Sequence, residues 1–201
     1  MSRMTPVFFC IALAGPGVAA PSFDCAKASG AVEELICADA DLAALDQVLA
    51  GRYSAAREVT RGLDAGAAEA ENTLKAEQRG WIKGRDDCWK AGDLRACVEA
   101  AYLMREGHLV ARWMLEAPFA TTFWTCGTPA NELVTMFFDT PLPSVRFERG
   151  DTVDTGTLTP TASGSRYEGS FGRSLWIKGD EATWREADPD GTTVTCTAAG
   201  S

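Results

Sequence analysis

Few side chains in this 201-residue chain could carry out chemistry. The single histidine, His108, lies in a helix-like segment without an evident partner, so a serine-hydrolase triad would lack its base. No G-x-S-x-G sequence is present to form a nucleophile elbow. Asp86-Asp87 and Asp180-Glu181 are adjacent acidic pairs, and neighbouring side chains on a helix or a strand point in different directions. They do not resemble two facing glycosidase carboxylates. We therefore expect a binding protein rather than an enzyme.

The first twenty residues are typical of a secretory signal peptide. Arg3 precedes a short apolar run over 7–14, and small residues at 17–20 suit a signal peptidase. The run is too short for a stable membrane anchor. Cys10 lacks the small residues that a lipoprotein signal places before its cysteine. We expect residues 1–20 to be removed, leaving a periplasmic or secreted protein without stable membrane insertion.

Cysteine is the other chemically distinctive residue type. Removal of Cys10 leaves six cysteines, and an even number in an exported protein predicts disulfides. Six cysteines allow about 15 pairings, so the connectivity stays open. Spacing favours Cys25–Cys37, Cys88–Cys97 and Cys126–Cys196. A metal site is disfavoured because C-x-x-C is absent and histidine is scarce. We expect no metal and no cofactor.

The net charge of −9 limits the classes of partner. An acidic surface repels the phosphates of nucleic acid, which we exclude as a partner. A basic protein would be attracted to such a surface. Charge alone decides little, since many proteins are acidic for solubility.

Residues 21–117 predict a small helical bundle. Ala, Leu, Glu and Arg are frequent, and Leu42, Leu45, Leu49 and Tyr53 recur at helical spacing. Predicted helices run over about 41–62, 67–81 and 93–113. The two disulfides that close short loops, Cys25–Cys37 and Cys88–Cys97, would stabilise this bundle.

Residues 118–201 have the texture of an all-β domain, with a turn signal every eight to twelve positions. Eight antiparallel strands in this length predict a small closed β-barrel, so the fold class is α+β with two domains. Joining Cys126 to Cys196 would remove about 4 kcal/mol of unfolded-chain freedom. The predicted strands cover 123–126, 132–138, 144–147, 156–159, 165–170, 174–178, 181–186 and 192–197.

Two segments of the β domain stand out. One is Ser163-Gly164-Ser165-Arg166-Tyr167, a loop entering a strand, and the other is Trp176–Ala182, a strand ending in a glycine turn. Ordinary roles fit both segments: the glycines would make turns, Tyr167 and Trp176 would be core, and Lys178 would be a solvated charge.

These segments, with Thr125-Cys126-Gly127 before them and Cys196 after them, resemble the membrane-bound and periplasmic inhibitors of C-type lysozyme. The resemblance covers residues 122–198 and implies an eight-stranded antiparallel barrel. In that family, two loops carrying a serine and a lysine enter the lysozyme cleft and meet its two catalytic carboxylates.

The family motifs imply roles for five residues of this chain. The serine of S-G-x-x-Y corresponds to Ser163, and the lysine of K-G corresponds to Lys178. Gly164 and Tyr167 would shape the serine loop, and Gly179 would accompany the lysine. The sequence departs from the family at the residue before the lysine, where an isoleucine replaces a residue that is commonly polar.

The first half is similar to the helical domain of the LprI-type family, over residues 23–109. Its namesakes are associated with lysozyme inhibition, but no site motif carries over. Trp81 is expected in the core, and Arg85 in an ion network with Asp86 or Asp87. The resemblance rests on Phe23–Ala28, Glu33–Cys37, Leu42–Asp46, Gln78–Trp81, Arg85–Cys88, Cys97 and Ala101-Tyr102.

The sequence therefore predicts a signal peptide (1–20), an LprI-like helical domain (21–117) and an inhibitor-like barrel (118–201). The expected function is inhibition of C-type lysozyme, with that basic protein as partner. The alternative is an envelope binding or scaffolding module of the same fold with another ligand, and a glycan-active enzyme ranks third. The sequence does not predict an oligomeric state.

Overall fold

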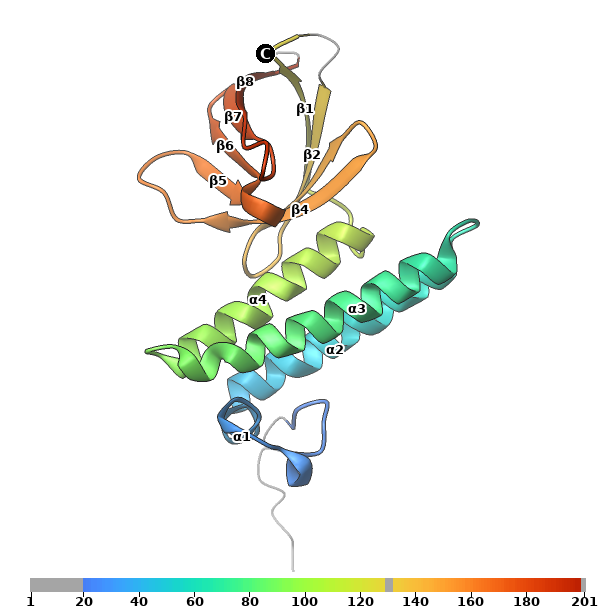
Figure 1. Cartoon of the computed structure of the whole chain (residues 1–201), viewed down its shortest axis with the longest axis vertical. Coiled ribbons are helices and arrows are strands. Elements are labelled where there is room, and N and C mark those ends of the chain that lie inside the picture. The colour runs from blue at the N-terminus through green and yellow to red at the C-terminus, as the bar shows by residue number, and fades with distance from the viewer. Residues whose placement is uncertain (1–19, 129–131, 200–201) are drawn as a thin grey trace, which may run out of the picture.

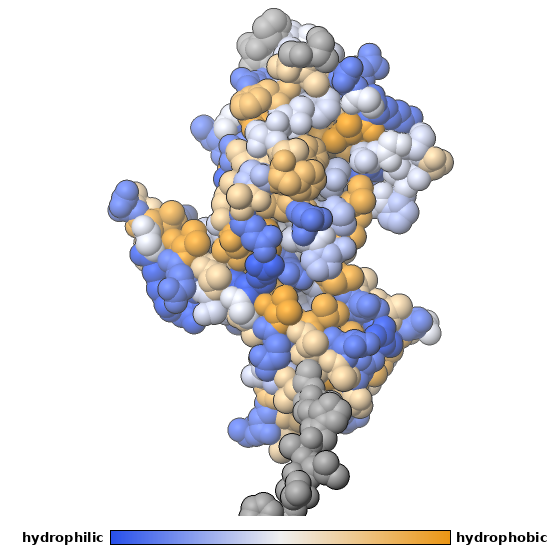
Figure 2. All heavy atoms as spheres, turned by 180° about the vertical axis from the view of Figure 1, so that it is seen from behind, coloured by the Kyte–Doolittle hydropathy of each residue, from blue (hydrophilic) through white to orange (hydrophobic). Residues whose placement is uncertain are grey.

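A computed structural model describes residues 20–128 and 132–199 of the chain. The expected signal peptide, with Cys10, lies outside the described residues apart from its last position. A helical part and a β-barrel lie end to end along the long axis (Figure 1). From behind, the barrel rises above the helical part, and one end of the helical part projects to the side (Figure 2).

The helical part contains four α-helices in the described residues: α1 (Ala31–Ala38), α2 (Ala40–Arg61), α3 (Ala67–Asp86) and α4 (Leu94–Trp113). Short 3-10 turns lie at η1 (Cys25–Lys27) and η2 (Asp87–Lys90). Asp39 caps α2 by accepting from the amides of Asp41 and Leu42, so this helix begins slightly earlier than predicted. Asp93 caps α4 by accepting from the amide of Ala96, at the predicted start. The sequence did not predict α1 as a separate helix.

A polar network crosses the helical core. The Tyr102 hydroxyl donates to Asp46 over 2.8 Å, and Arg85 donates to the Tyr102 oxygen over 2.9 Å. Arg85 also pairs with Asp86 at 2.7 Å, which confirms the predicted ion network. Burial raises the pKa of Tyr102, so its hydroxyl stays protonated and donates. Trp81 packs against this core half-buried, and its indole donates to the carbonyl of Ala101. The buried apolar residues are Val32, Ile36, Leu42, Leu49, Ala56, Leu74, Cys88, Val98, Tyr102 and Leu109.

The described strands of the second part close into a barrel in chain order, each antiparallel to the next. β1 completes the circle by pairing with β8, with Cys126 opposite Cys196. This confirms the predicted fold class. The strands are β1 (Ala120–Cys126), β2 (Glu132–Phe138), β3 (Ser144–Arg149), β4 (Thr152–Thr159), β5 (Ser165–Glu168), β6 (Ser174–Lys178), β7 (Glu181–Arg185) and β8 (Thr193–Ala198).

Side chains from alternate positions fill the barrel. Trp184 and Phe147 meet edge to face with ring centroids 5.2 Å apart, and both are fully buried. The remaining buried core residues are Trp124, Cys126, Leu133, Phe137, Val145, Tyr167, Leu175, Ala182 and Cys196.

Disulfides join the cysteines among the described residues in the pairs that their spacing favours. Cys25–Cys37 and Cys88–Cys97 close short loops of the helical part. Cys126–Cys196 joins the first barrel strand to the last. The described residues contain no group of three or more His, Cys, Asp or Glu placed to hold a metal ion. None of the described helices has the length and apolar character needed to span a bilayer.

Helix α4 docks directly on the barrel. Gly107 approaches so closely that a β-carbon there would lie 2.9 Å from Cβ of Ser144 on β3. Arg112 donates to the carbonyl of Val153 on β4 over 2.8 Å, and Arg146 of β3 donates back to the carbonyl of Arg112 over 2.6 Å. Apolar contacts between Val110, Ala111 and Phe138 seal the junction. The sequence patterns gave no sign of this contact.

Candidate functional site

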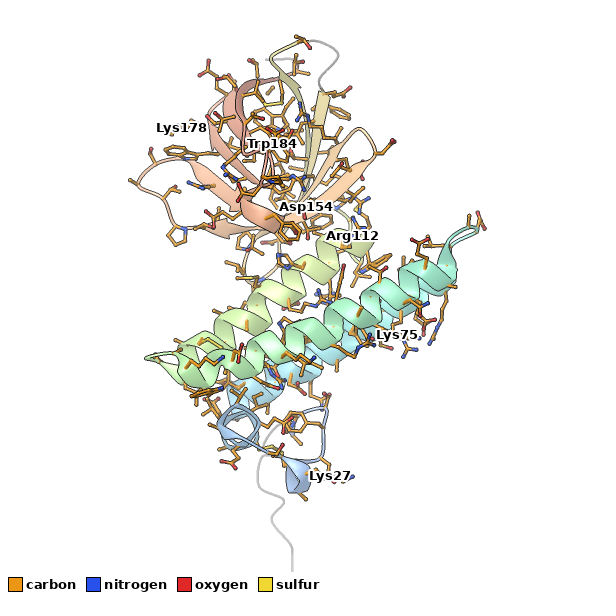
Figure 3. All side chains as sticks on the ribbon, viewed as in Figure 1. Lys27, Lys75, Arg112, Asp154, Lys178 and Trp184 are labelled. Atoms are coloured by element: carbon orange, nitrogen blue, oxygen red, sulfur yellow. A yellow bond between two sulfur atoms is a disulfide. The ribbon has the colours of Figure 1, made fainter. Side chains whose placement is uncertain are left out.

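Ser163 and Lys178 lie on neighbouring connections of the barrel. Ser163 is in the loop from β4 to β5, and Lys178 ends β6 just before the turn into β7. Because β5 pairs antiparallel with β6, with Ser165 opposite Ile177, the serine loop lies beside the end of the lysine strand. Both side chains are exposed. The structure thus places the predicted serine and lysine on adjoining connections at one side of the barrel, where Figure 3 labels Lys178.

Trp176 contacts both the loop that carries Ser163 and the side chain of Lys178. Its indole nitrogen donates to the carbonyl oxygen of Ser163 over 2.9 Å. The ammonium of Lys178 lies 3.7 Å from the centre of the Trp176 ring, within cation–π range. Trp176 is half-buried and lies outside the barrel core, unlike the core role that its residue type allowed. Its function as a support was missed, although the W-x-K spacing places both side chains on one face of the strand.

Gly164 allows the serine loop to lie against β6. Its φ of +72° is in the left-handed region, and a β-carbon there would collide with the carbonyl oxygen of Ile177. The same β-carbon would lie 3.0 Å from Cγ of Lys178. The hydroxyl of Thr161 steadies the loop by donating to the carbonyls of Ser163 and Gly164. Glycine is therefore required at this position by the fold of the site itself.

Substituting Gly164 with alanine should displace the serine loop from β6. The positive φ alone costs about 1–2 kcal/mol for a residue with a β-carbon, and the collision adds to that cost. Gly179→Ala is the matched control, because Gly179 also has a positive φ, +62°, but its β-carbon would meet no atom within 4 Å. Thermal unfolding and the indole NMR signal of Trp176 would measure the difference. Equal destabilisation by both variants, with an unmoved Trp176 signal, would contradict this account.

Tyr167 and Gly179, the other two residues that the family motifs imply, are placed differently from Ser163 and Lys178. Tyr167 is only 7% exposed and packs its ring 5.4 Å from that of Phe137 inside the barrel. Burial raises the pKa of its hydroxyl. Tyr167 therefore supports the base of the serine loop rather than facing a partner. Gly179 forms the exposed turn that directly follows Lys178.

Ser163 and Lys178 protrude instead of enclosing a cavity. Figure 1 shows the connection from β4 to β5 projecting away from the barrel. Beside Lys178 lies only a shallow hollow of about 160 Å³, bounded by Trp176, Glu181 and Thr195 among others. A projecting hydroxyl and ammonium are suited to entering a cleft on another molecule.

Comparison with known proteins decides the family. The family model described as lysozyme inhibitor LprI matches residues 25–108, and that of the membrane-bound lysozyme inhibitor of c-type lysozyme matches residues 124–193. The lipoprotein LprI of Mycobacterium bovis and its counterparts in two Mycobacterium tuberculosis strains are each 30% identical over 160 residues. These alignments cover 79% of this chain and 76% of each relative. The chain belongs to the LprI family.

The two matches fit the architecture of this LprI-family chain. The first covers most of the helical part, and the second begins in β1 and includes both site connections. Both family descriptions name lysozyme inhibitors, which supports a lysozyme inhibitor role, implies lysozyme as the partner and agrees with a non-catalytic protein. The combination of LprI and c-type inhibitor segments in one chain confirms the resemblances drawn from the motifs.

Proposed function

We propose that this LprI-family protein blocks a C-type lysozyme by inserting the Ser163 loop and Lys178 into the active-site cleft of the enzyme. The observation that carries the proposal is the exposed serine–lysine pair held together by Trp176, through the indole bond to Ser163 and the ring beneath Lys178. Gly164 fixes the spacing of the pair by its close approach to β6.

The chemistry of a lysozyme cleft complements this pair. A retaining glycosidase holds two carboxyl groups about 5–5.5 Å apart, one of them protonated to act as an acid. The Lys178 ammonium would pair with the charged carboxylate, and the Ser163 hydroxyl would donate to or accept from a carboxyl group. Neither side chain offers a glycosidic bond, so the enzyme would be plugged.

Binding would add a carboxylate contact to the exposed Lys178 ammonium, at the expense of at most its contact with the Trp176 ring. An exposed cation–π contact is worth about 0.5–1 kcal/mol. A hydrogen bond to a charged group contributes about 1.5–3 kcal/mol, and more where water is excluded. The exchange therefore favours the bound state. In the free protein, the ring holds the ammonium near the serine loop and lowers the entropy lost on binding.

The rest of the chain would assist this encounter. A net charge of −9 steers a basic partner toward the protein and speeds association at low salt. We propose removal of residues 1–20 as a signal peptide, and domains over 21–117 and 118–201. An envelope location, periplasmic or secreted, agrees with the lipoprotein relatives.

The proposal is tested by cell-wall hydrolysis with a C-type lysozyme, titrated with the purified, oxidised protein. We expect inhibition that reaches completion near a 1:1 ratio at enzyme concentrations above Kd. A folded excess that leaves the enzyme fully active would refute the proposal for that lysozyme and favour an envelope binding module with another ligand.

Ser163→Ala should weaken inhibition about tenfold, because one hydroxyl hydrogen bond of about 1–1.5 kcal/mol is lost. Its carbonyl, which accepts from Trp176, is retained in the variant. Ser165→Ala, an exposed serine at the start of β5, is the control and should inhibit normally. Inhibition constants from the same hydrolysis assay would decide; an unchanged constant for Ser163→Ala would remove the serine from the site.

A further inference from the structure

A second cavity lies at the junction of the helical part and the barrel, away from Ser163 and Lys178. It has a volume of about 410 Å³. Helix α4 lines one wall, and β4 with the turn η3 (Ser170–Gly172) lines the other. Arg112 of α4 and Asp154 of β4 mark its two walls in Figure 3. We call it the junction cleft.

Two hydrogen-bond donors of the junction cleft are unsatisfied. Nη2 of Arg105 and the indole nitrogen of Trp113 are buried and have no acceptor among the described residues. The Arg105 side chain is 9% exposed, and the nearest carboxylate oxygen, on Glu77, lies 3.8 Å from its Nη1. Native proteins seldom leave buried donors without acceptors, so an acceptor bound in the cleft would account for these two donors. Oxygen acceptors in the cleft would satisfy them after small side-chain adjustments.

Two arginines and two acids line the junction cleft, and one of the two acids is engaged by a further arginine. Arg112 has no carboxylate within 4.0 Å among the described residues, and it donates instead to the carbonyl of Val153. Asp154 is already engaged, because it pairs with Arg173 at 2.6 Å and accepts from both the amide and the hydroxyl of Ser170. Two arginines thus face only one other acid, the half-exposed Glu77.

The buried setting of these charges also favours an anion. Burial lowers the pKa of Arg105, which means that its positive charge is poorly solvated in the free protein. Burial and the neighbouring Arg105 lower the pKa of His108 to about 4, so this imidazole is neutral near pH 7. A carboxylate would stabilise the arginine charges in this low-dielectric setting.

Phe171 adds an aromatic surface at the mouth of the cleft. It is 80% exposed and has a φ of +53°, a conformation that is unfavourable for an aromatic residue. The amide of Asp188 holds this turn by donating to the carbonyl of Phe171 over 2.8 Å. Residues held in sparsely populated backbone conformations cluster at active sites and ligand-binding sites. An aromatic face beside polar donors suits a ligand that has both apolar C–H faces and oxygen atoms.

We propose that the junction cleft binds a carboxylate-bearing sugar. Arg105 and Arg112 would hold the carboxylate, the Trp113 indole would donate to an oxygen of the sugar, and Phe171 would cover an apolar face of the ring. This site goes beyond lysozyme inhibition and does not require it. An LprI-family protein with such a site could attach to acidic glycan while its barrel loops engage an enzyme.

Three small ligands test the contributions of the carboxylate and of the sugar ring separately. N-acetylmuramic acid carries a lactyl carboxylate, N-acetylglucosamine is the same sugar without it, and lactate is the carboxylate without the sugar. Calorimetry and ligand-observed NMR with the full mature protein should show N-acetylmuramic acid binding about tenfold more tightly than either of the others. Equal binding of both sugars, or no binding of any ligand at about 10 mM, would overturn the proposal.

Substitutions of the cleft residues test whether N-acetylmuramic acid binds in the junction cleft. Arg112→Gln should reduce binding of N-acetylmuramic acid to the level of N-acetylglucosamine, whereas Phe171→Asn, which tolerates the positive φ, should weaken both sugars. A Ser163→Ala/Lys178→Ala double variant should bind N-acetylmuramic acid like the unmodified protein, so the two proposals fail independently. Unchanged binding in Arg112→Gln, with circular dichroism showing an intact fold, would exclude the junction cleft as the site.

Discussion

Lys178→Glu should raise the inhibition constant for a C-type lysozyme at least about a hundredfold. The substitution removes a charge-assisted bond to a desolvated carboxylate, a loss of about 2–5 kcal/mol, and places a like charge against that carboxylate. The exposed side chain contributes no packing to the barrel core, so the fold should persist. Inhibition constants from cell-wall hydrolysis would measure the effect, with near-ultraviolet circular dichroism to report on the fold.

The chain supplies a matched control for this substitution. Lys90 is also an exposed lysine beside a tryptophan, with its ammonium 5.5 Å from the Trp89 ring, but it lies in η2 of the helical part. Lys90→Glu makes the same change of charge and should leave inhibition within about twofold of the unmodified protein. If both variants inhibit equally well, Lys178 does not enter the cleft. If both fail equally, net charge rather than a specific contact governs binding.

Removing the Cys126–Cys196 disulfide should destabilise the barrel by about 4 kcal/mol, because this bond restrains the longest disulfide loop, with a sequence separation of 70. Alanine is the suitable replacement at both positions, since both sulfurs are fully buried and serine would bury unpaired hydroxyls. Denaturant unfolding followed by the near-ultraviolet signal of the barrel tryptophans would report the loss.

A second double variant tests whether that loss is local. Cys25→Ala/Cys37→Ala opens a loop with a separation of only 12 residues and should cost about 3 kcal/mol in the helical part. Far-ultraviolet circular dichroism at the helical band would follow this transition. A barrel that unfolds at the same denaturant concentration with and without the Cys126–Cys196 bond would show that strand pairing between β1 and β8 suffices to close it.

Much of this fold could be predicted from local patterns. Core-facing residues recur at alternate positions of the barrel strands, and turn residues separate the strands, so the number of strands and their approximate ranges could be predicted from the sequence. Helix α4 was located from Asp93 and its apolar spacing. Helix α1 was not predicted as a separate helix because only Asp39 lies between its eight residues and α2. The two helices share one run of helix-forming residues.

The candidate site was predictable to a lesser extent. Family motifs pointed to Ser163 and Lys178, and the strand register explains why they lie close together. The support from Trp176 depends on a rotamer and on a loop carbonyl, neither of which has a sequence signature. The docking of α4 was also hidden, because Gly107 and Val110 occur at spacings found in any helix.

The close approach of Gly107 to Ser144 bears on how such a two-part protein can evolve. An interface without room for a methyl group at Gly107 cannot accept an arbitrary exchange of one part by recombination, because any side chain there, or a larger one at Ser144, would force the parts apart. Replacement at the helix position would require compensating change on β3. The helical part and the barrel of this lineage should therefore be inherited as a unit, with correlated substitutions along α4, β3 and β4.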